Sequence, residues 1–506
     1  MKRVYHILLN IASTLIILSI YSCGSPESSA LTRTILKDTD SYFYLDVKDY
    51  PENTSMLPVG VFDSGTGGLT ILDNIVNYDN FNNSTNITLA GGDGIPDFQN
   101  EWFIYLGDQA NMPYGNYAAE NNTELLREHI IKDIQFLLGN KYYRSANSVD
   151  FECNKVPVKS IVIACNTATA FGKETIESFL REAKLDIGVI GVIGAGVRSA
   201  FNHISPAKDC SIGVMATAGT VSSGGYIHAI NQYVNTMNHD GDVSVFQQAG
   251  IGLAGAIDGS PEYISTTATL PYIEYRGPSF DHSTAVIDKT FLDRYDFEWD
   301  NNQILFTGNS ENPDNVQLNS VENYIRYHVI SLLEQLRNTE EAKSLKVIIL
   351  GCTHYPFYVS QIQSQLQRLY HYEENGNPIY QPFMDENIVL VDPAHNTARE
   401  LYDYLCETQL LNDSRIDKSE FYISIPNVTN PTVQLDTFGN FTYKYKYGRT
   451  VGSIQEYVKR VPFSRETLGN ETVQRMSREI PVVYQLIRYF NQANIKTGYL
   501  SEQQIL

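Results

Sequence analysis

Two stretches of similar pattern organise the chain: IVIACNTA at residues 161–168 and VIILGCTHYP at residues 347–356. Each begins with β-branched and apolar residues and ends in a small residue, a cysteine and polar side chains. A continuous apolar run of this length is typical of a strand buried in a parallel sheet. Ligands of open α/β sheets bind beyond the carboxyl ends of the strands, so Cys165 and Cys352 are expected where chemistry takes place. Two thiols from separate halves of the chain indicate one acid and one base that act on a single carbon.

The composition is that of a globular protein. At 506 residues the chain is long enough for about two to four domains with substantial cores. The formal net charge of −21 argues against a nucleic-acid partner, which requires a basic surface. The same charge repels an acidic substrate at long range, so local donors have to hold such a substrate. Six cysteines in a chain of this length do not form a disulfide scaffold.

The N-terminus predicts export. Lys2 and Arg3 precede an apolar segment over residues 7–20, which is short for a membrane span and typical of a signal peptide. The segment runs into the sequence IYSCG, which resembles a bacterial lipoprotein box with Cys23 as the lipidated residue. We therefore expect residues 1–23 to be a lipoprotein-type signal peptide, with an ordinary signal peptide or an N-terminal anchor as alternatives. The mature chain is expected in the periplasm or at the cell surface, held to the membrane by its lipidated N-terminus.

Strands and helices alternate over much of the remaining chain, which predicts an α/β protein with parallel sheets. Four segments depart from this alternation. Residues 24–57 are rich in Ser, Thr and Asp and are expected to form a tether, and residues 79–101 are rich in Asn and Gly and are expected to be an insertion. Residues 259–320 carry no long helical period and predict a second insertion, a β-rich flap or loop domain. Residues 411–506 have a mixed pattern to which no chemistry can be assigned.

The first strand–helix unit offers a site for an anion. Residues 59–62 predict a strand, which continues into DSGTGG at residues 63–68 and then into a helix. A glycine-rich turn of this kind lets backbone N–H groups approach a carboxylate or a phosphate at the helix N-terminus. Asp63 lies at the end of the strand, in the same place as the two cysteines.

Together these motifs resemble the glutamate racemase family of the aspartate/glutamate racemase superfamily, in the form of an exported, lipoprotein-like variant. The matching stretches, in the family's order, are GVFDSGTGGLT at 60–70, YLGD at 105–108, PYG at 113–115, ACNTA at 164–168, AT at 216–217 with GTV at 219–221, and GCTHYP at 351–356. They cover about residues 58–405 apart from the two insertions. The THYP ending resembles glutamate racemases more than aspartate racemases, whose second motif typically has a glutamate after the threonine.

The resemblance implies two pseudo-symmetric α/β subdomains with mostly parallel sheets and an active site in the cleft between them. The first subdomain would comprise residues 58–192 plus 357–410, and the second residues 193–356, each with its own insertion. Residues 411–506 would be a C-terminal extension of unknown role. A homodimer is an option that rests on the resemblance alone.

The resemblance also implies a cofactor-independent racemase that interconverts L- and D-glutamate, a reaction that supplies D-glutamate for peptidoglycan. Inverting an α-carbon without a cofactor needs a base on one face and a proton donor on the other. Cys165 and Cys352 would supply them, assisted by Asp63 and His354, with no metal ion. The implied substrate-binding residues are Asp63, Ser64, Tyr114, Gly115, Asn166, Thr167, Thr353 and His354. Family members commonly carry a glutamate near the position that aligns with Asp258.

The sequence leaves two alternatives open. The substrate could be aspartate or another amino acid, because the insertions can reshape the mouth of the cleft. The chain could also be a non-catalytic amino-acid-binding lipoprotein that keeps the fold. An exported enzyme has no direct access to the cytoplasmic pathway for peptidoglycan precursors, which favours this second alternative, whereas the presence of both thiols favours catalysis.

Overall fold

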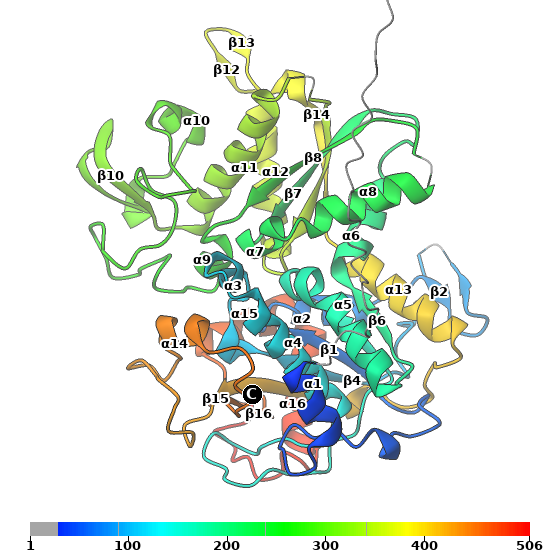
Figure 1. Ribbon diagram of the computed structural model, residues 1–506. Coiled ribbons are helices and arrows are strands. Elements are labelled where there is room, and N and C mark those ends of the chain that lie inside the picture. The colour runs from blue at the N-terminus through cyan, green and yellow to red at the C-terminus, as the bar shows by residue number, and fades with distance from the viewer. Residues whose placement is uncertain (1–28, 90, 238, 341) are drawn as a thin grey trace, which may run out of the picture.

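A computed structural model describes residues 29–89, 91–237, 239–340 and 342–506. The chain forms two lobes, each built on a sheet with helices packed around it (Figure 1). The expected signal peptide and its lipidation site, Cys23, lie outside the described residues. Within the described ranges, no helix combines the length and the apolar character that crossing a bilayer requires.

The first lobe contains a six-stranded sheet. In spatial order its strands are β16 (Val458–Pro462), β15 (Glu420–Pro426), β4 (Phe103–Gly107), β1 (Val59–Asp63), β5 (Ser160–Ile163) and β6 (Gly188–Gly191). All neighbours pair in parallel except β15 and β16, which are antiparallel. Every residue of β1 and β5 is buried, as their continuous apolar runs predict.

Helices close the core of this lobe. They are α1 (Ala30–Lys37), α2 (Leu69–Val76), α3 (Gly115–Ala119), α4 (Thr123–Leu138), α5 (Asn166–Ala183), α13 (Ala394–Glu407), α14 (Tyr443–Gly448), α15 (Asn470–Glu479) and α16 (Pro481–Ala493). Since α5 begins shortly after β5 ends, the turn between them lies at the carboxyl edge of the sheet.

The second lobe contains a four-stranded parallel sheet. Its strands, in spatial order, are β14 (Met384–Val391), β11 (Leu345–Gly351), β7 (Cys210–Ala216) and β8 (Val243–Ala249). Its helices are α6 (Val192–Phe201), α7 (Ala218–Ser222), α8 (Gly225–Met237), α9 (Leu253–Ile257), α11 (Val321–Arg337) and α12 (Val359–Tyr370). The predicted α/β class with mostly parallel sheets is confirmed.

The chain returns to the first lobe later than predicted. The sequence placed the return after residue 357, but α12 and β14 both belong to the second lobe. Val389 of β14 pairs with Val347 of β11, and Ile362 and Leu366 of α12 are buried in the second-lobe core. The return therefore comes after β14, where α13 packs on α2 of the first lobe. The apolar pattern predicted the strand but not the sheet that it joins.

The segment expected to be a tether is partly ordered against the first lobe. Helix α1 begins after Ser29, whose side chain accepts a hydrogen bond from a backbone N–H of the first turn. Leu31 and Ile35 of this helix are 2% and 0% exposed and belong to the first-lobe core. Their spacing of four residues places both on one helical face, which is why the segment packs rather than extends.

Residues 411–506 are an integral part of the first lobe. Strand β15 pairs in parallel with β4, with Phe421 opposite Tyr105, and β16 continues the sheet. Helix α16 buries Val483, Ile487 and Phe490 in the same core. This region therefore adds two strands to the first-lobe sheet and covers the edge that β4 would otherwise expose.

The two predicted insertions form small local structures. Residues 79–101 contain a short antiparallel pair, β2 (Phe81–Asn82) and β3 (Ile87–Thr88). Residues 259–320 contain helix α10 (Leu292–Tyr295) and the antiparallel hairpin β9 (Ile304–Asn309) and β10 (Asn312–Leu318). A further pair, β12 (Glu373–Glu374) and β13 (Asn377–Pro378), follows α12.

Candidate active site

One cavity lies between the lobes and contains both predicted thiols. Its volume is about 410 Å³, and every predicted catalytic and substrate-binding residue lines it. Cys165 follows β5 and Cys352 follows β11, so each thiol extends from the carboxyl edge of a parallel sheet. The structure thus brings together two cysteines from separate lobes in one cavity.

Cys165 caps the first turn of α5. Its sulfur accepts a hydrogen bond from the N–H of Ala168 at 3.4 Å, and its S–H donates to the Ser64 hydroxyl at 3.6 Å. A helix N-terminus favours negative charge on a sulfur. Burial nevertheless raises the pKa of Cys165 to about 12, and the Asp63 carboxylate adds to this shift. The thiol is therefore protonated at rest and is suited to donate a proton.

Asp63 holds the glycine-rich turn in place. Its Oδ2 accepts hydrogen bonds from the N–H groups of Gly65 at 3.1 Å and Gly68 at 2.9 Å. A Cβ on Gly68 would lie only 2.4 Å from the Asp63 side chain, so this close approach requires glycine. Burial raises the pKa of Asp63, although these hydrogen bonds and the charge of His354 oppose the shift. Asp63 thus acts on Cys165 through its charge, while Ser64 makes the direct contact with the sulfur.

Cys352 faces a histidine that is held by a carboxylate. The Nδ1 atom of His354 lies 3.5 Å from the sulfur of Cys352, and Nε2 lies 3.0 Å from Oδ2 of Asp258. Burial lowers the pKa of His354, but Asp258 and Cys352 outweigh this effect and hold the pKa well above its usual value. A cationic imidazole at this place stabilises negative charge on the sulfur of Cys352. Asp258, the position at which the resemblance leads us to expect a longer carboxylate, reaches the histidine.

Two predicted substrate-binding side chains connect the lobes. Thr167 Oγ1 lies 3.0 Å from Thr217 Oγ1 and 3.1 Å from Thr220 Oγ1, and both partners belong to the second lobe. The Tyr226 hydroxyl, also from the second lobe, donates to Asn166 Oδ1 at 2.6 Å. These contacts form a polar bridge between the lobes beside the thiols. Thr217 itself lines the cavity and was not among the predicted residues.

The phenol of Tyr114 forms its hydrogen bonds inside the first lobe rather than in the cavity. Its oxygen lies 2.6 Å from Asp108 Oδ2 and 2.8 Å from Asp133 Oδ2, and the residue is 2% exposed. Gly115 follows, and a Cβ added to the facing Gly219 would lie 2.7 Å from the Cα of Gly115. This stretch therefore contributes to the cavity mainly through close backbone packing between the lobes, rather than through a free hydroxyl.

Thr353 also lies where the lobes meet. A Cβ on Gly67 of the first lobe would come within 2.6 Å of Thr353 Oγ1 and 2.9 Å of the His354 ring. The glycine-rich turn therefore packs directly against the second cysteine motif, and this contact explains the need for glycine at position 67.

The sequence reasoning missed the residues that the C-terminal region and the second insertion bring to the site. Tyr443, Lys446 and Tyr447 of α14 line the cavity, and so does Arg276, whose guanidinium lies 4.4 Å from the ring centre of Tyr443. Burial lowers the pKa of Lys446 to about 8. Its ammonium group donates to the backbone oxygen of Met112 at 2.6 Å. Helix α14 has the sequence YKYKYG, in which no pattern distinguishes a binding residue from a surface residue.

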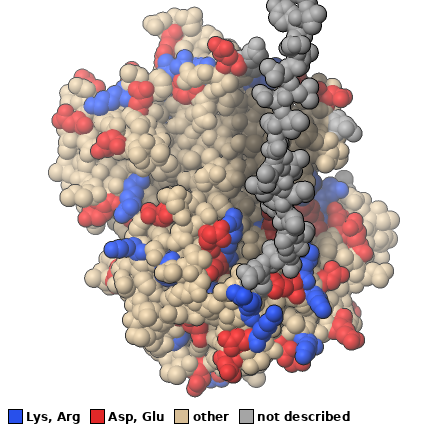
Figure 2. Space-filling model, in the orientation of Figure 1, with Lys and Arg blue, Asp and Glu red and all other residues tan. Residues whose placement is uncertain are grey.

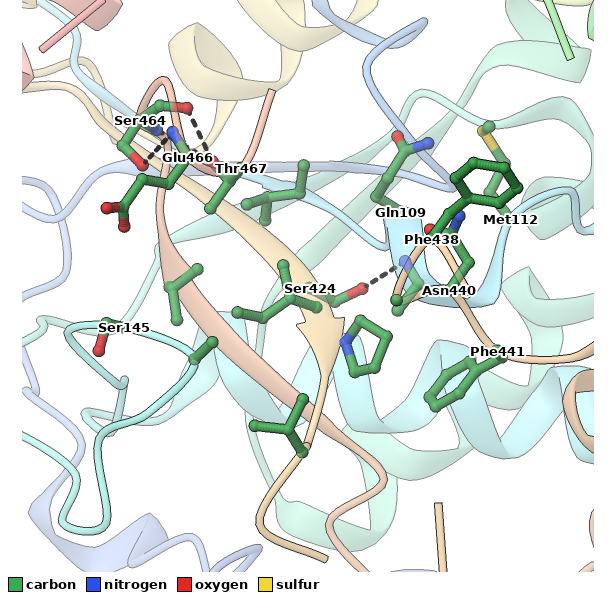
Figure 3. A pocket seen from close by; sticks show the side chains of 18 of the residues that line it. Gln109, Met112, Ser145, Ser424, Phe438, Asn440, Phe441, Ser464, Glu466 and Thr467 are labelled. Carbon is green, nitrogen blue, oxygen red and sulfur yellow. Dashed lines mark hydrogen bonds between the residues drawn. The ribbon is translucent and has the colours of Figure 1, made fainter. Parts of the chain in front are cut away.

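A larger hollow of about 1120 Å³ adjoins this cavity and shares Met112, Phe441 and Lys446 with it. Figure 3 shows Met112, Phe438 and Phe441 along one part of this hollow and Ser464 and Thr467 along another. Strands β15 and β16 form its floor, so it exists because the C-terminal region extends the sheet. The hollow lies beside the thiol cavity and contains neither cysteine.

Comparisons with known proteins give consistent matches. The chain is 26% identical over 371 residues to the glutamate racemase of Thermoanaerobacter pseudethanolicus, a match that covers 72% of this chain and 88% of the relative. It is 26% identical over 356 residues to the glutamate racemase of Oceanobacillus iheyensis, covering 70% and 82% of the two chains. Among solved structures, the glutamate racemase isoform RacE1 of Bacillus anthracis matches with a TM-score of 0.42 and 21% identity, covering 72% of this chain and 87% of that one. No family model matches the chain.

Proposed function

We propose that this chain, a homologue of the glutamate racemases, is an amino-acid racemase that interconverts L- and D-glutamate without a cofactor. The observation that carries this proposal is the pair of thiols: Cys165 and Cys352 come from different lobes, both are buried, and both line one cavity. A binding protein needs contacts to the carboxylates and the amine, whereas a thiol from each lobe provides an acid and a base for the α-carbon. The sequence similarity to glutamate racemases over most of both chains supports the same activity.

The proton balance of the reaction is simple. One cysteine, as thiolate, takes the α-proton from one face of the substrate, and the C–H electron pair remains on the carbon as a carbanion. The other cysteine, as thiol, gives its proton to the opposite face. The enzyme then holds the two protonation states in exchanged positions, ready for the opposite enantiomer. No group outside the site and no redox step is required.

The two sulfurs have different electrostatic surroundings. The raised pKa of Cys165 keeps this thiol protonated. The cationic His354, 3.5 Å from the sulfur of Cys352, favours negative charge there. In the direction in which Cys165 donates its proton, Cys352 is the base that takes the α-proton. In the opposite direction Cys165 has to ionise, and the substrate ammonium group can offset part of the cost of that charge.

Local cations support an acidic substrate. Figure 2 shows Asp and Glu side chains spread among Lys and Arg over the visible face, and the chain as a whole carries a net charge of −21. An anionic substrate is therefore attracted by groups inside the cleft rather than by the overall field. Arg276 and Lys446 line the cavity and can provide this attraction.

We also propose that the enzyme works outside the cytoplasm as a lipoprotein. The support is in the sequence: Lys2 and Arg3, the apolar segment over residues 7–20 and the cysteine at position 23. A lipid-anchored racemase would act on free amino acids in the periplasm or at the cell surface.

Proton exchange tests the proposal directly. Full-length protein, kept reduced in detergent and heavy water, should place deuterium on the α-carbon of L- and D-glutamate, which proton NMR detects, and a chiral assay should detect racemisation. Cys165→Ser and Cys352→Ser should each lower the rate of racemisation by about 10²–10⁴-fold. Because the two thiols act as a unit, the double variant should lose little more than either single one. Cys153→Ser, at an exposed cysteine, is the matched control and should retain full activity.

Three results would count against the proposal. Exchange with aspartate but not with glutamate would change the substrate. Full activity in either single variant would remove that cysteine from the mechanism. Tight glutamate binding in calorimetry without exchange, with both thiols titratable, would make the chain an amino-acid receptor.

A further inference from the structure

The C-terminal region contacts the second lobe close to the catalytic residues. Arg475 of α15 contacts the end of α9 in the second lobe. One guanidinium nitrogen donates to Oδ1 of Asp258 at 3.1 Å, and the other donates to the backbone oxygen of Ile257 at 3.3 Å. The guanidinium carbon lies 5.8 Å from the ring centre of Phe357, which limits its movement on a third side.

Asp258 divides its two carboxylate oxygens between two partners. Oδ1 accepts from Arg475, while Oδ2 lies 3.0 Å from Nε2 of His354. The opposite ring nitrogen of His354, Nδ1, faces the sulfur of Cys352 at 3.5 Å. A continuous series of polar contacts thus runs from α15 of the C-terminal region to the thiol of the second lobe.

The geometry of this series constrains the imidazole. A carboxylate that is held at one oxygen by a guanidinium cannot rotate freely, so its second oxygen stays directed at Nε2. That oxygen keeps a proton on Nε2 and orients the ring so that Nδ1 faces the sulfur of Cys352. The side chains of Arg475 and Asp258 are only 18% and 16% exposed, so solvent screens their interaction less than it screens a surface pair.

The charges of both partners of Asp258 favour its ionised form. Burial raises the pKa of Asp258, but His354 and then Arg475 outweigh it and hold the pKa below its ordinary value. The other ionisable group that lines the outer side of this contact is Glu471 of α15. The charge of His354 also acts on Asp63 of the first lobe. A carboxylate in this setting remains ionised over the whole neutral range.

We propose that Arg475 is a positioning residue of the racemase site, which fixes Asp258 and through it the ring of His354 beside Cys352. This inference rests on the proposed function and extends it, because it makes the C-terminal region a part of the catalytic apparatus. Arg475 does not line the cavity that contains the two thiols. It acts only through Asp258.

The test uses three variants on one helix. Arg475→Met keeps the aliphatic stem and removes the guanidinium, and Arg475→Lys restores the charge without the planar fork. Arg478→Met is the matched control, because the Arg478 side chain is 73% exposed on the same helix and, among the residues that the structure describes, pairs only with its neighbour Glu479. We expect Arg475→Met to lower kcat by about 10–100-fold with little change in KM, the range for partners that orient a histidine in metal sites. The Arg478→Met enzyme should match the wild type.

Two further measurements separate positioning from general damage. The acid limb of the pH–rate profile should move to higher pH in Arg475→Met, because Asp258 loses a charge that keeps it ionised, and Arg475→Lys should move it back. The primary deuterium isotope effect should rise for the enantiomer whose α-hydrogen faces Cys352 and not for the other. The ratio of kcat/KM for the two enantiomers equals the equilibrium constant, which is one for a racemisation. Any variant therefore changes kcat/KM equally in both directions, and the isotope effect is the measurement that can differ between them.

One readout does not depend on turnover. In carboxyl ¹³C NMR, with Asp258→Asn used for assignment, the titration of Asp258 should move upward in Arg475→Met. An unmoved titration, or wild-type kcat and pH profile in Arg475→Met, would overturn the inference. If the wild type does not racemise glutamate, the proposed function is refuted. A shifted titration of Asp258 in Arg475→Met would then still show that Arg475 interacts with Asp258.

Discussion

Asp133 provides a quantitative test of the buried network behind the cleft. Its carboxyl is 0% exposed, its Oδ1 accepts from Arg460 of β16 at 2.8 Å, and its Oδ2 lies 2.8 Å from the Tyr114 hydroxyl. The same hydroxyl lies 2.6 Å from Asp108. One phenol hydrogen can serve only one carboxylate at a time, so the second contact requires a proton on a carboxyl. Burial, with the Asp108 charge, raises the pKa of Asp133 to about 8, although Arg460 opposes the shift.

This pKa makes the free energy of unfolding depend on pH. The unfolded carboxyl titrates near pH 3.9, so between about pH 4 and pH 8 the folded protein binds a proton that the unfolded chain has lost. The resulting stability is fully present below about pH 4, is lost progressively as the pH rises from about 4 to about 8, and does not fall further above that. Each pH unit in that window is worth about 1.36 kcal/mol, so the group costs about 4 kcal/mol between pH 5 and pH 8.

The Asp133→Asn variant should remove this cost. An amide has the shape of the protonated acid, can accept from Arg460 and can donate to Tyr114, so stability at pH 5 should change by less than about 1 kcal/mol. Between pH 5 and pH 8 the variant should gain about 4 kcal/mol relative to the wild type, measured by urea unfolding at each pH. Glu124→Gln, at an exposed carboxyl on the same helix, should leave the pH dependence unchanged.

The opposite protonation state predicts a different curve. If Asp133 were ionised at pH 5, it would form a buried charged pair with Arg460. Replacing one partner of such a pair costs about 3–5 kcal/mol. The variant would then be destabilised throughout, with a curve parallel to that of the wild type, and this result would refute the reasoning.

Two further predictions follow from the site and from the C-terminal region. Since the pKa of Cys165 is raised to about 12, its alkylation by iodoacetamide should increase about tenfold per pH unit from pH 7 to pH 10 without a plateau, measured by mass spectrometry of its peptide; a plateau below about pH 9.5 would contradict this. Phe490 is 0% exposed and packs on Tyr422 at 5.8 Å, so Phe490→Ala should lower the free energy of unfolding by about 3–5 kcal/mol. Tyr489→Ala, on the 45% exposed neighbour, should change the free energy of unfolding by no more than about 0.5 kcal/mol. A loss for Phe490→Ala as small as that for Tyr489→Ala would contradict the packing of α16 in the core.

The sequence was informative where the chemistry is local. The strands before Cys165 and Cys352 are continuous apolar runs that end in polar residues, so their burial and the position of the thiols could both be predicted. His354 lies within the second of these motifs, and Asp63 ends another apolar strand, over residues 59–62, so both were found for the same reason. The resemblance added the expectation that the two halves form one cleft.

The remaining features depend on tertiary contacts that leave no local pattern. Arg475 belongs to an amphipathic helix in which the charged side chains of Glu471 and Arg478 are exposed, and only the packing of α15 against α9 distinguishes it. Strand β14 has the apolar residues of a core strand, but a strand carries no signal for the sheet that it joins. The amphipathic helix α1 is too short to fold by itself, so its order comes from the core on which Leu31 and Ile35 pack.

The position of β15 in the first sheet has a consequence for biosynthesis. A chain emerging from the ribosome completes β1, β4 and β5 long before residues 420–426 exist, so β4 has an open edge during most of synthesis. An exposed strand edge is a template for pairing with other chains, and domains tend to fold in the order of their synthesis. A nascent chain interrupted before β15 would carry both cysteine motifs and still present that edge. Premature termination in this region should therefore yield aggregates or substrates of quality-control proteases rather than a shortened enzyme.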